Sequence, residues 1–339
     1  MTSRNSLISK TMKFTREDRL KSWYYFLSTL VLCGMAFYGT YVVGSIGGKF
    51  ICGLLAGLLT SRLFVIYHDF HHEAILRKSK AARLLMTIFG ITTLAPASIW
   101  NETHEHHHNH NSKFSRYVVG SFPILSTETF RNSSRAQQRW YLMLRHPLMI
   151  LFAYVPIFLV SFCLWPFFEN PRRYYDCGLA AILHFIFGGM LYALGGWSAV
   201  VFSLIIPCII MFAIGGYIFY AQHNFPSVIL RDDNRWDYLE AALHSSSYIK
   251  MNRLMRWFTA NIGYHHIHHV NSRIPFYRLP ETMKCLEELQ HPRSTSLHPF
   301  EIWKCLQLKL WDDKNGKMIT MQEYQRSQAH VQFSFDSRE

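Results

Sequence analysis

Charged side chains are scarce in this sequence, because Asp, Glu, Lys and Arg make up only 17% of its 339 residues. Soluble domains usually carry about 25% charged residues, so the composition argues against an ordinary soluble fold. The seven cysteines contain no Cys-x-x-Cys pair, and Cys33, Cys52, Cys163 and Cys208 lie within apolar stretches. The sequence therefore gives no basis for a disulfide framework or a zinc finger.

Negative charge is also in short supply, and the net charge is +13. The basic residues lie mostly beside apolar segments, for example in residues 1–22 and in the run from Arg77 to Arg83. This placement is typical of the positive-inside bias of membrane proteins rather than of nucleic-acid binding. We expect a multi-pass membrane protein that binds no nucleic acid and whose basic side is cytoplasmic.

Hydrophobic residues, by contrast, make up 50% of the chain and concentrate in six stretches. These cover residues 23–43, 50–67, 84–100, 147–168, 178–195 and 197–220. A helix needs ~20 apolar residues to cross a membrane, so several of the stretches are long enough. The chain divides into a cytoplasmic N-terminal segment (1–22), a membrane domain (23–280) and a cytoplasmic C-terminal tail (281–339).

Histidine is the other abundant residue, with nineteen copies, most of them in three clusters. Each cluster contains the spacing His-x-x-His-His, whose positions i, i+3 and i+4 share one face of a helix. The clusters are His68, His71 and His72; then His104, His106, His107, His108 and His110; then His265, His266, His268 and His269. Each can present convergent imidazoles.

Convergent imidazoles predict metal binding, since neutral imidazole suits Fe, Zn, Cu and Ni. Eight or nine ligands are too many for one ion, so we expect two metals. All-nitrogen ligation at a membrane face favours two iron ions with O₂ as co-substrate, whereas hydrolytic zinc usually adds a carboxylate or keeps three protein ligands. Asp69 and Glu105 either orient ligating imidazoles or are merely solvated. His110 and His266 lie off the shared faces or at their edges, so we expect them to support the ligands from outside or to be structural rather than to bind metal.

A single site built from all three clusters restricts the topology, because the clusters must then lie on one side of the membrane. Residues 84–100 cannot cross, and we expect 147–168 and 197–220 to span while 178–195 is re-entrant or tucked against the outer side. The predicted fold is an all-α integral membrane protein with four transmembrane helices and re-entrant or interfacial helices. A cytoplasmic cap carries the histidine clusters and the di-iron site.

The three clusters, read as HDFHH, HEHHH and HHIHH, resemble the histidine boxes of the membrane fatty acid desaturase family. The flanking sequences HEHHHNHNSKF and NIGYHHIHHVNSRIPFYRLP are similar as well, and the resemblance covers about residues 50–280. It implies nine metal ligands: His68, His72, His104, His107, His108, His223, His265, His268 and His269. The first box holds the additional His71, so the choice between His71 and His72 stays open.

The resemblance also implies the chemistry. A di-iron centre reduced by an external donor, such as ferredoxin or cytochrome b5, would use O₂ to remove two hydrogens from adjacent methylenes of an acyl chain. Residues 271–279 resemble the branch that acts on acyl chains in lipids, including the Δ12 (ω6) enzymes. We therefore expect an acyl-lipid substrate and contact with membrane lipids.

Two alternatives remain. The same iron scaffold could serve a hydroxylase, an epoxygenase or a carotenoid oxygenase. A protein of another class, a histidine-rich membrane metal-binding or transport protein, would place its ligands at mid-membrane within the spans. The boxes here lie at span ends and in polar segments, which favours the enzyme.

Overall fold

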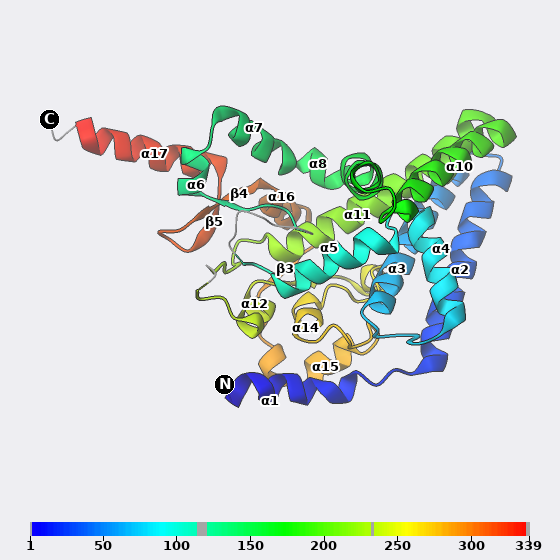
Figure 1. The fold of residues 1–339 in the computed structure, drawn as a ribbon, viewed down its shortest axis with the longest axis horizontal. Coiled ribbons are helices and arrows are strands. Elements are labelled where there is room, and N and C mark those ends of the chain that lie inside the picture. The colour runs from blue at the N-terminus through cyan, green and yellow to red at the C-terminus, as the bar shows by residue number, and fades with distance from the viewer. Residues whose placement is uncertain (1, 114–120, 232–233, 337–339) are drawn as a thin grey trace.

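A computed structural model describes the backbone of residues 2–113, 121–231 and 234–336, and the side chains of residues 6–113, 121–231 and 234–329. The described chain is mostly helical (Figure 1). Its α-helices are α1 (Thr2–Thr11), α2 (Arg19–Val42), α3 (Ile46–His71), α4 (Lys80–Thr92), α5 (Ala97–Asn109), α6 (Thr127–Asn132), α7 (Arg135–Leu144), α8 (Pro147–Leu151), α9 (Trp165–Glu169), α10 (Tyr175–Val200), α11 (Ile206–His223), α12 (Tyr238–His244), α13 (Arg253–Phe258), α14 (His265–Val270), α15 (Leu279–Cys285), α16 (Pro299–Gln307) and α17 (Met321–Asp336).

Shorter elements complete the fold. Two are 3₁₀-helices, η1 (Met12–Phe14) and η4 (Glu287–Leu289), and two are π-helices, η2 (Tyr154–Leu164) and η3 (Val201–Ile205). The strands are β1 (Leu125–Ser126), β2 (Tyr248–Lys250), β3 (Ser294–Ser296), β4 (Leu308–Asp312) and β5 (Lys317–Thr320). They form two small sheets, ordered β1-β4-β5 and β2-β3, which the sequence reading did not predict.

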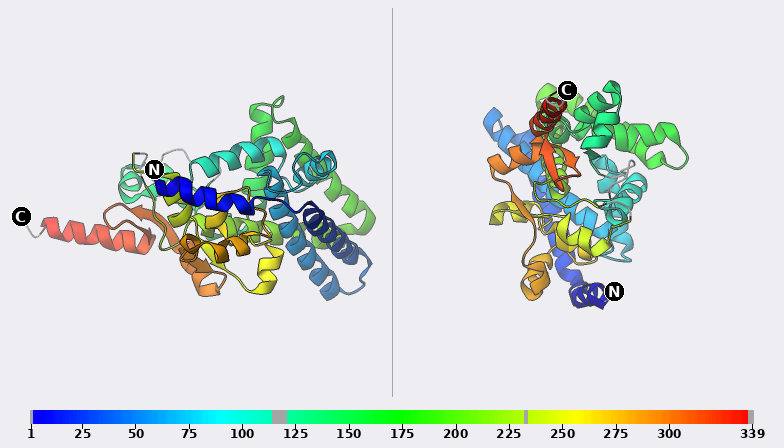
Figure 2. Two further views of the ribbon diagram at one scale, coloured as in Figure 1. Left: turned by 90° about the horizontal axis from the view of Figure 1, so that it is seen from below. Right: turned by 90° about the vertical axis from the view of Figure 1, so that its left-hand side faces the viewer.

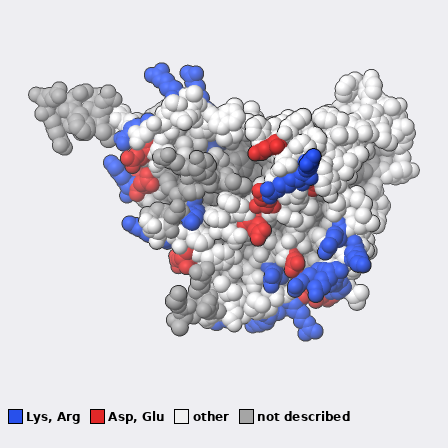
Figure 3. All heavy atoms as spheres, viewed as in Figure 1, with Lys and Arg blue, Asp and Glu red and all other residues white. Residues whose placement is uncertain are grey.

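Helices α2 and α3 form an apolar hairpin whose outer surface is itself apolar. On α2, Val31, Met35 and Tyr38 are each more than half exposed. Exposed apolar side chains along a helix of this length suit contact with lipid rather than water. Figure 3 agrees, because the upper right of that face, around α10, is nearly free of Lys, Arg, Asp and Glu.

The stretch Tyr175–His223 forms a second apolar hairpin. Its helix is broken at Gly195 and at Gly196, whose positive φ of 62° favours glycine. Leu204 Cδ2 lies 3.4 Å from the place a Cβ on Gly188 would take, so the two arms pack against each other in opposite directions. The green ribbon accordingly turns back on itself at one edge of the molecule (Figures 1 and 2).

Both hairpins turn at the same end of the molecule. Lys49 Nζ, near the start of α3, donates to Ser198 Oγ at 3.3 Å, just after the Gly195–Gly196 break. The histidines of α3 and α11 stand at the opposite ends of these helices. The two hairpins therefore form an apolar block whose histidine-bearing helix ends lie together, away from the turns.

Three helical stretches in the described chain are long and apolar enough to cross a membrane: Arg19–Val42, Ile46–His71 and Tyr175–His223. The count rises to four if α4 and α5 are taken as one span, although these two helices are bent by 90°. The bend agrees with the predicted re-entrant or interfacial character of residues 84–100. A helical membrane fold is thus confirmed.

Two apolar stretches differ from the predicted arrangement. Residues 147–168, predicted as one spanning helix, are divided into α8, η2 and α9. The helical path breaks at Phe152, four residues before Pro156, which lacks a backbone N–H for the helical ladder. The elements η2 and α9 then continue as one short apolar helix, Tyr154–Glu169. Residues 178–195, predicted to be re-entrant or tucked, belong to the first arm of the second hairpin.

Helices α12 to α15, which we call the polar cap, pack on the histidine-bearing ends of the hairpins. The largest buried apolar cluster includes Ile66 and Tyr67 of α3 together with Ile267 and Val270 of α14. This packing holds the third histidine box against the first. The division of the chain at residues 22 and 280 stays a prediction.

Candidate metal centre

Nine histidines meet in two adjacent groups at the junction of the apolar block and the cap. In each group, one ring nitrogen per residue lies within 4.8 Å of the corresponding nitrogens of the other members. We name the groups by their size. The five-histidine group is His68, His72, His104, His108 and His268; the four-histidine group is His107, His223, His265 and His269.

Helical spacing explains how a few short elements supply so many imidazoles. His104 and His108 are one turn apart on α5 and serve the five-histidine group, and His107 points to the other group. The short helix α14 does the same, since His268 joins the five-histidine group while His265 and His269 join the four-histidine group. Two helices therefore bridge both groups and hold them side by side.

Within each group the Nε2 atoms converge closely. In the five-histidine group, His104 Nε2 lies 2.9 Å from His72 Nε2 and 3.2 Å from His108 Nε2. In the four-histidine group, His265 Nε2 lies 2.9 Å from His223 Nε2 and 3.0 Å from His269 Nε2. Several nitrogens aimed at one point form a cluster of donors that a metal ion can organise.

Outer contacts set the orientation of several of these rings. His68 Nδ1 lies 3.2 Å from Asp69 Oδ1, and His107 Nδ1 lies 2.6 Å from Ser121 Oγ. His223 Nδ1 donates to the carbonyl of Ser245 at 3.2 Å. A proton on Nδ1 leaves the Nε2 lone pair free, which is the usual arrangement of metal-binding histidines.

Burial keeps the imidazoles of α14 neutral. Desolvation, followed by the neighbouring imidazoles, lowers the pKa of His268 and His269 well below the ordinary value. Neutral rings offer lone pairs instead of repelling a cation. His107 Nε2 is fully buried and has no hydrogen-bond partner within the described residues, so it fits a metal ligand. The residues present fit two metal ions with imidazole ligands.

The remaining sequence candidates lie outside the two groups. The ring of His71 packs against Tyr67, with ring centroids 4.3 Å apart. The five-histidine group contains His72 and not His71. His266 Nε2 donates to the carbonyl of Leu289 at 3.3 Å, and burial lowers its pKa to about 4. His110 and Glu105 are exposed on α5.

Asp69 is the one carboxylate candidate that contacts a ring of the site. It is buried, faces His68 through Oδ1, and accepts the backbone N–H of Phe276 through Oδ2 at 2.7 Å. It thereby links the first box to the segment after the third box. Asp69 is placed to orient His68, whereas Glu105 is not placed to orient any ring.

Ser121, Ser245 and Trp100 contact rings of the two groups and are not predicted by the sequence. Ser121 and Ser245 carry no spacing signal, because they lie 14 and 22 residues after their histidines, outside the helices that carry those histidines. Trp100 stacks on His104 with ring centroids 4.9 Å apart and an interplanar angle of 15°. Its place one helical turn before His104 was a usable signal, since residues i and i+4 share a face.

Known proteins provide an independent comparison. The family model described as fatty acid desaturase matches residues 45–300. The chain is 26% identical to a fatty acid desaturase of Bacillus subtilis (strain 168) over 268 residues, which cover 79% of this chain and 75% of that protein. It is 22% identical to an sn-1 oleoyl-lipid 12-desaturase of Anabaena variabilis, over 80% of this chain and 78% of that protein.

A plant protein is similar too. The chain is 24% identical to a Delta(12)-fatty-acid desaturase of Arabidopsis thaliana, over 69% of this chain and 64% of that protein. The family model spans both histidine groups and the second apolar hairpin. Of the first hairpin it covers α3 but not α2. With its helical membrane fold and its paired imidazole groups, the chain belongs to the fatty acid desaturase family of lipid-modifying oxidoreductases.

Proposed function

We propose that this protein is an O₂-dependent di-iron desaturase that introduces a cis double bond at the Δ12 position of an acyl chain carried by a membrane lipid. The observation that carries the proposal is the pair of all-imidazole groups at the ends of apolar helices. Five and four nitrogen donors suit two ions better than one. Relatives named as Δ12 desaturases support the finer assignment.

In this proposal the five-histidine group holds one iron and the four-histidine group holds the other. When bound, the iron pair supplies the oxidising power: O₂, two electrons and two protons take two hydrogens from the chain, forming a C=C bond and two waters. The electrons come from a separate redox protein. A relative named as a ferredoxin-dependent omega-3 desaturase, from Nostoc sp. (strain 36), supports a donor of the ferredoxin class.

The surrounding side chains orient the imidazole rings and exclude water from the site. Ser121, Ser245 and Asp69 fix ring orientations, so that the ligands do not have to reorganise during turnover. Trp100 covers one face of His104, and the nine rings are themselves mostly buried. A buried site keeps bulk water away from the reacting carbon atoms.

The aliphatic substrate offers no polar handle near the reacting carbons, so depth in an apolar slot must set the position of the new double bond. An existing cis double bond bends the chain, and a slot shaped for that bend would place the next methylenes beside the iron. Misplacement by about 1 Å can cost on the order of 10²-fold in rate. A slot that matches the bend would therefore select monounsaturated chains.

We also propose that both termini and the histidine groups face the cytoplasm. Basic side chains near the histidine-bearing end, including exposed Arg77, Lys80 and Arg83, support this orientation. Because both hairpins turn near Lys49 and Ser198, a reporter beside Gly196 should lie on the opposite side from a reporter at residue 112. Reporters at these two positions that fall on the same side would contradict the orientation.

The product test uses the full chain in a host whose lipids are rich in oleoyl chains and contain a compatible electron donor. We expect a diene in membrane lipids, detected by mass spectrometry of the fatty acids. New monoenes formed from saturated chains, with no diene, would overturn the Δ12 assignment and keep the desaturase. Hydroxylated or ketolated products alone would overturn both.

A further inference from the structure

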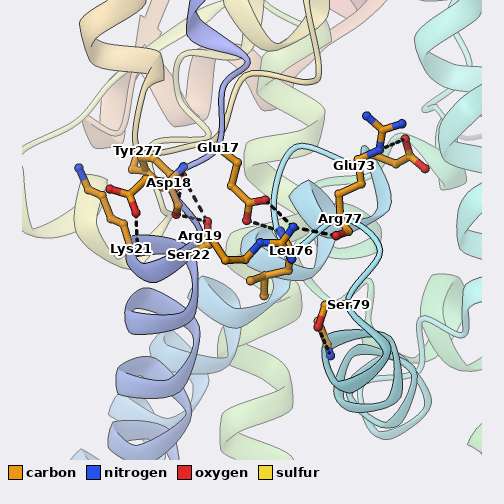
Figure 4. Close-up of polar contacts among 11 residues, drawn as sticks. Glu17, Asp18, Arg19, Lys21, Ser22, Glu73, Leu76, Arg77, Ser79 and Tyr277 are labelled. Carbon is orange, nitrogen blue, oxygen red and sulfur yellow. Dashed lines mark hydrogen bonds and ion pairs between the residues drawn. The ribbon is translucent and has the colours of Figure 1, made fainter.

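Residues 17–22, which we call the connector, comprise the last two residues before α2 and the first turn of α2. They bond to the loop that follows the first histidine box (Figure 4). The Glu17 carboxylate accepts the backbone N–H of Leu76. It also lies 3.3 Å from the guanidinium of Arg19, which in turn donates to the carbonyl of Arg77 at 2.8 Å. Glu17 is mostly buried, with a side chain 15% exposed, so the contact is shielded from water.

The connector also contacts the loop after the third box. The Asp18 backbone N–H donates to the Tyr277 hydroxyl at 3.0 Å, and the buried Ser22 hydroxyl lies 3.2 Å from the same oxygen. Just before the connector, Thr11 Oγ1 accepts from Asn271 Nδ2 at 3.0 Å. One N-terminal segment thus joins the two loops that leave the first and third boxes.

The loop bound by Glu17 needs such support. It begins directly after His72, and three of its residues, Glu73, Leu76 and Lys78, have positive φ angles of 55°, 51° and 61°. Residues other than glycine take this left-handed conformation only where surrounding contacts hold them there. Leu76 is also fully buried. Its backbone N–H would lose a partner if the Glu17 carboxylate were removed.

The connector lies outside the part of the chain that the desaturase family model matches, which begins at residue 45. We infer that Glu17 is a positioning residue for His72, acting through the Leu76 N–H to hold the loop that leaves the five-histidine group. This inference rests on the proposed metal centre. His72 of the five-histidine group directly precedes this loop, whereas no member of the four-histidine group adjoins it, so Glu17 should affect the two groups unequally.

The experiment compares Glu17→Ala, Glu17→Gln and wild type as full-length protein loaded with iron. Glu17→Gln keeps an oxygen that can accept the Leu76 N–H, and Glu17→Ala does not. The matched control is Glu281→Ala, which removes an exposed carboxylate paired with Arg278. Hydrogen exchange of residues 73–79 and iron content after dialysis against a chelator are measured for each.

In Glu17→Ala we expect exchange in residues 73–79 to rise about tenfold while exchange in residues 265–270 stays as in wild type. Iron should fall from about two to about one per chain, with Mössbauer spectra showing loss of one of two environments. Glu17→Gln and Glu281→Ala should resemble wild type in both measurements.

Unchanged exchange in Glu17→Ala would overturn the inference, as would equal loosening of both box regions or equal loss of both irons. Failure of Glu17→Gln to restore the wild-type behaviour would also overturn it. A wild-type protein that binds no iron would instead overturn the proposed metal centre. The exchange comparison would then still decide whether Glu17 orders the loop.

Discussion

The five-histidine and four-histidine groups share two helices but differ in the residues that hydrogen-bond to the Nδ1 atoms of their rings. In the five-histidine group, His68 faces a buried carboxylate, Asp69, which is itself fixed by the Phe276 N–H. In the four-histidine group, the outer hydrogen-bond partners of His107 and His223 among the described residues are the neutral oxygens of Ser121 and Ser245. A carboxylate both orients an imidazole and raises its basicity, whereas a neutral oxygen mainly orients it. The two proposed irons should therefore be unequal.

The largest expected loss of activity comes from two single variants, each of which removes one proposed ligand from one of the two groups. His268→Ala takes a ligand from the five-histidine group and His269→Ala takes one from the four-histidine group, on the same turn of α14. Each should lower desaturation by more than about 100-fold, because the proposed reaction uses both irons. Diene formation per amount of protein in membrane lipids measures this.

His291→Ala is the control for these two variants, because His291 is exposed and lies outside both groups. It should keep wild-type activity. If either His268→Ala or His269→Ala also kept it, the corresponding group would not be a catalytic metal site.

An intermediate effect should distinguish the outer contacts of the two groups. Asp69→Asn removes the negative charge beside His68 and should lower activity by roughly 10–100-fold. Ser121→Ala removes a neutral partner of His107 and should cost less than about tenfold. Activity at saturating substrate, normalised to bound iron, gives the comparison. Equal losses in the two variants would show that the charge of Asp69 adds nothing to its orienting role.

The smallest effect is expected on the exposed edge of α5. His110 stacks on His106 with ring centroids 4.1 Å apart and belongs to neither group. His110→Ala should change activity by less than about twofold and leave iron content unchanged, as surface substitutions usually do. A loss comparable to that of Asp69→Asn would place His110 in the function of the site.

Local spacing predicted more of the site than of the membrane arrangement. The i, i+3 and i+4 positions on a helix are fixed geometry, so the sequence predicts that His104, His107 and His108 face one site. It does not predict that His107 joins the four-histidine group while His104 and His108 join the five-histidine group. The assignment of His72 rather than His71 could not, because it depends on where α3 ends. The partners Ser121 and Ser245 depend on tertiary contacts of non-helical segments with α5 and α11, which leave no periodic pattern.

The sequence predicts the membrane arrangement of the apolar stretches less well, because hydrophobicity alone does not determine which of them form long helices. Residues 147–168 and 178–195 are both apolar, but a break at Phe152 leaves the first stretch only the short helix Tyr154–Glu169. The Gly195–Gly196 break lets the second pair with residues 197–223 as a hairpin. Burial of Leu306 and Leu310 in the polar C-terminal region likewise depends on packing that no short motif announces.

The most direct test of the account is the metal content of the purified wild-type protein, measured together with its Mössbauer spectrum. Nine imidazoles in two unequal groups predict about two irons per chain in two environments of equal population. A single iron, a single environment with one donor set, or stoichiometric zinc in place of iron would contradict the two-group metal centre.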